Sequence, residues 1–119
     1  MAKYECSLVG DFDQFLKTIN RKILEGSISA KFENGSNFSS GSISCAVRVY
    51  ERYSAFGGNR VSLSLTVIGN KADGKMFVSA ITSGGSKAVF MKINTVGEES
   101  FLRCLIDVVE AYKKTNRSV

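Results

Sequence analysis

The stretch Val61–Ala80, VSLSLTVIGNKADGKMFVSA, contains two runs in which apolar and polar residues alternate, with a polar segment between them. A period of two is typical of a half-buried β-strand, because successive side chains point to opposite faces of the sheet. The segment between the runs, Gly69–Gly74, is made largely of residue types that favour turns. The stretch therefore predicts an antiparallel hairpin with one apolar face, in which Val67 lies opposite Met76.

The same alternation continues on the N-terminal side of this hairpin. It marks further strands at Tyr4–Leu8, Ile28–Glu33 and Ile43–Tyr50. The polar stretch 33–41 predicts the turn between the last two of them. Counting back from the hairpin places Val49 opposite Leu65, so the more apolar side of the strand Ile43–Tyr50 joins the apolar face.

On the C-terminal side, Gly84 and Gly85 predict a second tight turn, because glycine adopts the positive backbone torsions that such turns need. The residues that follow, up to Ile93, then form a strand in which Ile93 lies opposite Met76. A phosphate-binding loop is the alternative interpretation of Thr82–Val89, TSGGSKAV. Such a loop would be expected to lead into a helix, and the GxxxxGK[ST] motif is absent, so the sequence favours the hairpin.

Two segments, Asp11–Glu25 and Val96–Lys114, show the spacing of amphipathic helices, with Asp11 and Thr95 at the N-cap positions. The order strand, helix, four to five strands, helix predicts a single α+β domain over residues 1–119. We expect a curved antiparallel sheet with both helices packed on one face. This order is similar to that of the TATA-box-binding-protein-like and helix-grip folds, a topological likeness that implies no function.

The composition is that of a soluble globular protein, with 44% hydrophobic and 23% charged residues and a formal net charge of +5. No secretory signal or membrane-spanning stretch is evident, which predicts a cytoplasmic protein without membrane contact. The lack of histidine removes the side chain most used in acid-base catalysis and metal binding. Cys6, Cys45 and Cys104 are far apart and fit buried reduced thiols better than a metal site or disulfides. We therefore expect no metal, no cofactor and no catalytic residues.

The face of the sheet turned away from the helices is the candidate site. The predicted register places the following residues on it: Arg48, Tyr50, Arg52, Ser64, Phe77, Ser79, Phe90 and Lys92. Phe77 and Phe90 are then neighbours, and a solvated sheet face would not expose two phenylalanines side by side. Something should therefore cover part of this face. A second copy of the chain is the favoured cover, and the N-terminal segment or a long loop is the other structural explanation.

Two ligand-binding alternatives use the same residues. A small anionic or amphipathic molecule could pair with the two arginines and rest against the aromatic side chains. Single-stranded nucleic acid could stack on aromatic residues interleaved with arginines, although no RNP-type aromatic signature supports this. An enzyme using carboxylate or lysine chemistry is the remaining class, with Glu51, which the register places on the apolar face, as an acid-base candidate.

Three strings carry a likeness to a known family. They are Cys45–Ser54 (CAVRVYERYS), Gly58–Gly69 (GNRVSLSLTVIG) and Ser79–Phe101 (SAITSGGSKAVFMKINTVGEESF). In this order and at this spacing they resemble a family of small bacterial proteins known only as a domain of unknown function. The resemblance extends over essentially the whole chain and implies a stand-alone bacterial cytoplasmic protein. It implies no activity, cofactor or catalytic residue, so the expectation of a non-enzymatic, homodimeric interaction protein depends on the strand register alone.

Overall fold

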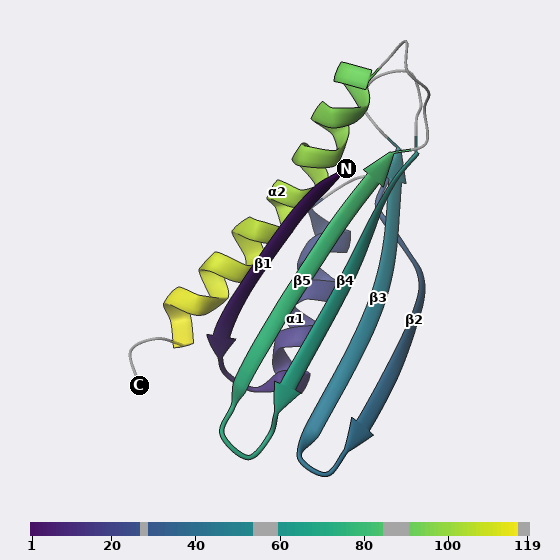
Figure 1. The fold of residues 1–119 in the computed structure, drawn as a ribbon. Coiled ribbons are helices and arrows are strands. Elements are labelled where there is room, and N and C mark those ends of the chain that lie inside the picture. The colour runs from purple at the N-terminus through teal and green to yellow at the C-terminus, as the bar shows by residue number, and fades with distance from the viewer. Residues whose placement is uncertain (27–28, 54–59, 85–90, 117–119) are drawn as a thin grey trace.

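The computed structural model describes residues 1–26, 29–53, 60–84 and 91–116. Its elements are β1 (Ala2–Val9), α1 (Phe12–Glu25), β2 (Lys31–Ser40), β3 (Ile43–Tyr53), β4 (Arg60–Asn70), β5 (Lys75–Gly84) and α2 (Met91–Asn116). The strands form one antiparallel, curved sheet in the order β1-β5-β4-β3-β2, and both helices lie on the same side of it (Figure 1). The predicted α+β class, with a curved antiparallel sheet and two helices on one face, is confirmed.

The strand predicted after the two glycines is wrong. The residues Met91–Ile93 form the start of α2 instead of a strand end. A strand returning from Gly84 would have to pair with the outer edge of β5, but β1 already occupies that edge, with Glu5 opposite Ser79. Gly84, the first residue of the predicted turn, ends β5, and Gly85 lies with residues 86–90 outside the described residues.

The two predicted helix caps differ in outcome. The Asp11 cap is confirmed, because its Oδ1 accepts a hydrogen bond from the backbone N–H of Gln14 at 2.8 Å and satisfies a free amide at the start of α1. Thr95 lies within α2, which begins four residues earlier at Met91, so the second predicted cap is wrong. Tyr112 of α2 binds the same end of α1, since its hydroxyl accepts a hydrogen bond from the Asp11 N–H at 3.2 Å.

The second strand also differs from its prediction. β2 covers Lys31–Ser40 and runs through most of the stretch 33–41 that was expected to turn. The turn lies later, where Gly41 has a φ of +59°. β2 accommodates its turn-forming residues because it is an edge strand with every residue exposed, and its pairing with β3 is irregular between Phe32 and Asn34.

Two register shifts separate the predicted sheet from the observed one. In the β4–β5 hairpin, Val67 lies opposite Val78, two residues beyond its predicted partner. A shift of two leaves every side chain on its predicted face. Between β3 and β4, Leu65 lies opposite Arg48 where Val49 was expected. This shift of one residue turns every side chain of β3 to the other face.

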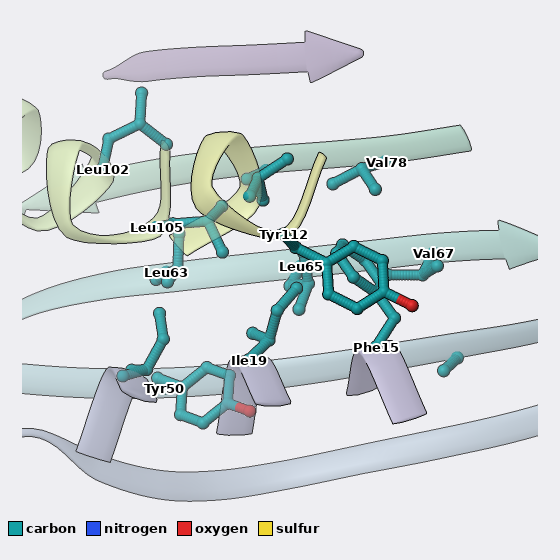
Figure 2. Packing of buried hydrophobic residues seen from close by; sticks show 14 of the residues in the cluster. Phe15, Ile19, Tyr50, Leu63, Leu65, Val67, Val78, Leu102, Leu105 and Tyr112 are labelled. Carbon is teal, nitrogen blue, oxygen red and sulfur yellow. The ribbon is translucent and has the colours of Figure 1, made fainter. Parts of the chain in front are cut away.

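The core lies between the helices and the face of the sheet that they cover (Figure 2). Its fully buried members include Tyr50 and Leu65 from the sheet and Phe15 and Leu105 from the helices. The rings of Phe15 and Tyr112 pack edge to face with their centroids 4.8 Å apart, which joins α1 to α2. Neither helix, over the ranges given above, combines the length and apolar character needed to cross a bilayer.

Candidate functional site

Arg48, Tyr50 and Arg52 lie on the helix-covered face of the sheet, so their predicted place on the open face is wrong. Tyr50 is fully buried, and its hydroxyl donates a hydrogen bond to Oδ1 of Asn20 in α1 at 2.9 Å. Burial raises the pKa of Tyr50 to about 12, and the nearby Arg48 guanidinium offsets part of this rise. The physical reason for the reversal is the one-residue shift of β3, which lets its most buried aromatic ring pack against α1.

Arg52 connects β3 to α2. Its Nη2 donates a hydrogen bond to Ser100 Oγ at 2.9 Å, and its guanidinium lies 4.6 Å from the centre of the Phe101 ring, a cation–π contact. Its Nη1 lies 3.8 Å from Cys104 Sγ. Through these contacts the Arg52 side chain holds α2 against β3.

The remaining predicted residues have three different outcomes. Ser64, Phe77 and Ser79 lie on the open face, because they alternate with the buried residues of β4 and β5. Lys92 belongs to α2, so its predicted place in a strand is wrong. Phe90 lies outside the described residues. The sheet therefore separates the two arginines from Phe77, which removes the interleaving of arginines and aromatic residues that supported nucleic-acid binding.

The open face instead carries the side of β3 that was expected in the core. Strand pairing gathers one large apolar residue from each strand near the end of the sheet, and we call this set the open-face patch: Val9, Phe38, Ile43, Ile68 and Phe77. The members are between 43% and 62% exposed. Scattered apolar side chains are normal on protein surfaces, but a contiguous group of this kind is a candidate contact surface.

Four patch residues line an open hollow of about 500 Å³: Val9, Ile43, Ile68 and Phe77. Among the described residues of the chain, the rest of the lining is uncharged except for Lys75, which is its one ionisable group. A single cation provides no acid-base pair. The hollow is therefore suited to apolar contact and not to proton-transfer chemistry.

Glu51 lies on the open face as well, so its predicted place on the apolar face is wrong for the same reason as that of Arg48. It forms an ion pair with Arg60, and it accepts a hydrogen bond from Ser62 Oγ at 3.1 Å. The environment of a lone buried carboxylate, which would have made Glu51 an acid-base candidate, is thus not present. Immediately around Glu51 the open face is polar.

The sequence contains a signal for the patch that the predicted register concealed. The residues of β3 that form its outward side, Ile43, Cys45, Val47 and Val49, are the more apolar set of that strand. Phe38 belongs to the stretch 33–41 that the sequence predicts as a turn, and Val9 directly follows the predicted strand Tyr4–Leu8. With the register of β3 known, its own outward residues, Ile43 among them, can be placed from the sequence, whereas Val9 and Phe38 depend on the pairing of β1 and β2.

Residues 1–113 match the model of a family of unknown function (DUF6054). No curated protein and no solved structure matches the chain significantly. The matched range runs from β1 into the last turns of α2 and so includes both faces of the sheet. The topological likeness to the TATA-box-binding-protein-like and helix-grip folds stays a prediction.

Proposed function

The chain belongs to the DUF6054 family, whose function is unknown, and we propose that it is a non-enzymatic interaction protein that forms a homodimer through the open face of its sheet. The observation that carries this proposal is the open-face patch, to which every strand contributes one exposed apolar side chain. We expect the dimer to act in the bacterial cytoplasm. The protein acts by binding through shape complementarity and apolar contact, and it does not catalyse a reaction on a substrate.

The size of the face supports a second copy as the occupant. Five strands about 4.8 Å apart and about ten residues long give a face of roughly 24 by 33 Å, or about 800 Å². Stable interfaces bury about 800 Å² of accessible surface on each partner, so the proposed contact extends from the patch over most of the face. In a two-fold dimer each face meets its own copy, so one patch supplies both sides of the contact.

The N-terminal segment, the other cover considered from the sequence, does not fill this role. Residues Ala2–Val9 form β1 and pair with β5 at the edge of the sheet. Val9 is itself a member of the patch. The segment therefore extends the face and leaves it open.

One member of the patch lies outside the hollow that the other four line. Phe38 is its most exposed member, at 62%, and it stands beside the hollow without lining it. In a two-fold arrangement, Phe38 of one copy would enter the hollow of the other, and the reverse contact follows by symmetry. Two sheets packed in this way lie about 10 Å apart, with side chains interdigitated.

The test is the mass of the protein in solution for the wild type and two matched variants. Phe77 and Phe32 are 45% and 46% exposed, but Phe32 lies on the opposite side of the sheet, facing Tyr50. We expect light scattering to give twice the chain mass of 12.9 kDa for the wild type and for Phe32→Glu, and the single mass for Phe77→Glu. Circular dichroism checks that each variant is folded. A monomeric wild type, or a dimer that survives Phe77→Glu, would overturn the proposal.

A further inference from the structure

The helices leave part of their own side of the sheet uncovered, and a groove remains there. β2 lies at the edge farthest from β1 and α2, and all of its residues are exposed (Figure 1). Between α1 and the strands β2 and β3 lies a groove of about 360 Å³, lined by Leu16, Lys17, Asn20, Phe32 and Arg48. This volume falls in the lower range of small-molecule sites.

Arg48 is held in this groove by its own backbone surroundings. Its Nη1 donates hydrogen bonds to the carbonyl oxygens of Ser36 at 3.1 Å and Val47 at 2.9 Å. Gly35 lies opposite it in the register, and a Cβ atom at that position would come within 3.0 Å of Arg48 Cδ. A glycine there leaves room for the arginine stem to lie across β2. The guanidinium is therefore positioned before any ligand arrives.

The positive charge of the groove has no acidic counterpart in the part of the chain that the structure describes. Neither Lys17 nor Arg48 takes part in an ion pair there. Asp13 stands one helical turn before Lys17, but it pairs with Lys71 at 3.3 Å. A half-buried guanidinium and an ammonium group thus border one hollow without a carboxylate. Such an arrangement favours an anion.

The other lining residues provide apolar contact and one polar group. Leu16 is half-buried and Phe32 is partly exposed, with the Phe32 ring at an edge-to-face angle 5.8 Å from Tyr50. Asn20 uses its carbonyl oxygen to accept from the Tyr50 hydroxyl, so its amide group can still donate a hydrogen bond. The groove therefore combines two cations, one amide donor and an apolar wall.

We propose that this groove binds a small amphipathic carboxylate. The Arg48 guanidinium forms a paired hydrogen bond with the two carboxylate oxygens, and Lys17 adds a second positive charge. The hydrocarbon part of the ligand lies against Leu16 and Phe32. Because the groove and the open-face patch lie on opposite faces of the sheet, this inference does not depend on the proposed dimer.

The binding test uses octanoate as the probe and two-dimensional NMR of the uniformly labelled chain as the readout. We expect saturable shifts in Leu16, Asn20 and the residues around Arg48, and binding that weakens as salt concentration rises. Octanol lacks the charge and acetate lacks the chain, so both should bind at least about tenfold more weakly than octanoate. Equal binding of octanol, shifts centred elsewhere, or no saturable shift would each overturn the proposal.

Substitutions assign the charge partners. Arg48→Gln should weaken octanoate binding about tenfold or more, and Lys17→Gln should weaken it less, because its ammonium lies on the exposed side of the groove. Lys22→Gln removes the same charge from the same helix outside the groove and should leave binding unchanged. If Arg48→Gln does not fold, Lys17→Gln and Phe32→Ala decide the question, since both change exposed side chains. Wild-type affinity in both of these variants would refute the site.

The same ligand titration separates this inference from the proposed dimer. Phe77→Glu should abolish dimerisation and keep octanoate binding, whereas Phe32→Ala should weaken octanoate binding and keep the dimer. Loss of both properties in either variant would contradict two independent sites.

Discussion

β3 and β4 are neighbouring strands of 11 residues, and both alternate between more and less apolar side chains. The more apolar side of β3 and that of β4 nevertheless lie on opposite faces of the sheet. β4 turns its apolar side, which includes Leu65 and Val67, toward the helices. β3 turns its more apolar side, which includes Val49, away from them and places Tyr50 in the core. Alternation thus identifies a strand, whereas contacts with the helices decide which side is buried.

The inward residues of β3 have specific partners on the helices. Tyr50 binds Asn20 of α1, and Arg52 stacks on Phe101 of α2. Ala46, also fully buried, offers little bulk between the sheet and the helices. The apolar residues left on the other side form part of the exposed surface from which the proposed dimer follows. The register that completes the core is therefore also the register that leaves these apolar residues on the open face, where the proposed dimer forms.

Matched valine substitutions compare the buried side of β4 with the open side of β3, and we expect them to give the largest effect on the free energy of unfolding. Val67→Ala removes two buried methyl groups from β4 and should lower the free energy of unfolding by about 2–3 kcal/mol, because a cavity remains. Val49→Ala on the open side of β3 should cost less than about 1 kcal/mol. Urea denaturation measures both, in the Phe77→Glu background so that dimerisation does not contribute. Equal costs at the two positions would place Val49 in the core and contradict the observed register.

Much of the fold could be predicted from the sequence because its signals are local. The alternation of Val61–Val67, the cap at Asp11 and the helical spacing up to Glu25 each involve residues close together in the chain. The face of β3 could not be predicted in this way. It depends on a long-range contact between Tyr50 and Asn20.

The predicted faces of the candidate-site residues depended on the register of each strand pair, and the prediction was wrong for the residues of β3. Phe77, Ser64 and Ser79 kept their face because the β4–β5 register moved by two residues. Arg48 and Tyr50 changed face because the β3–β4 register moved by one. The helical start at Met91 was missed for a different reason, since the edge of β5 is taken by a strand from the other end of the chain.

The titration of Tyr50 gives a smaller test of the same contrast. Its pKa is raised from 10.0 in an exposed tyrosine to about 12 in the fold, mainly by burial, so folding favours the neutral phenol. The stability this provides is present below pH 10 and is lost as the pH rises through 12. Burial likewise raises the pKa of Tyr4 and Tyr112, so the wild type should lose stability over this range.

Tyr50→Phe isolates the contribution of Tyr50. At neutral pH the variant should be about 1 kcal/mol less stable than the wild type, because the hydrogen bond to Asn20 is lost. That difference should shrink and then reverse between pH 10 and pH 12, because Tyr50 ionises in the unfolded wild type while it stays neutral in the fold. A phenolate signal for Tyr50 that titrates near pH 10 would mean that this side chain is exposed to solvent.

The most direct test of the account is an isotope-filtered NOE experiment on a mixture of methyl-labelled and unlabelled chains. If the outward side of β3 and its neighbours forms the dimer contact, intermolecular NOEs should appear at the methyl groups of Val9, Ile43 and Ile68 and not at those of Leu63 or Leu65. Intermolecular NOEs confined to the helices, or their complete lack at these three residues, would contradict it.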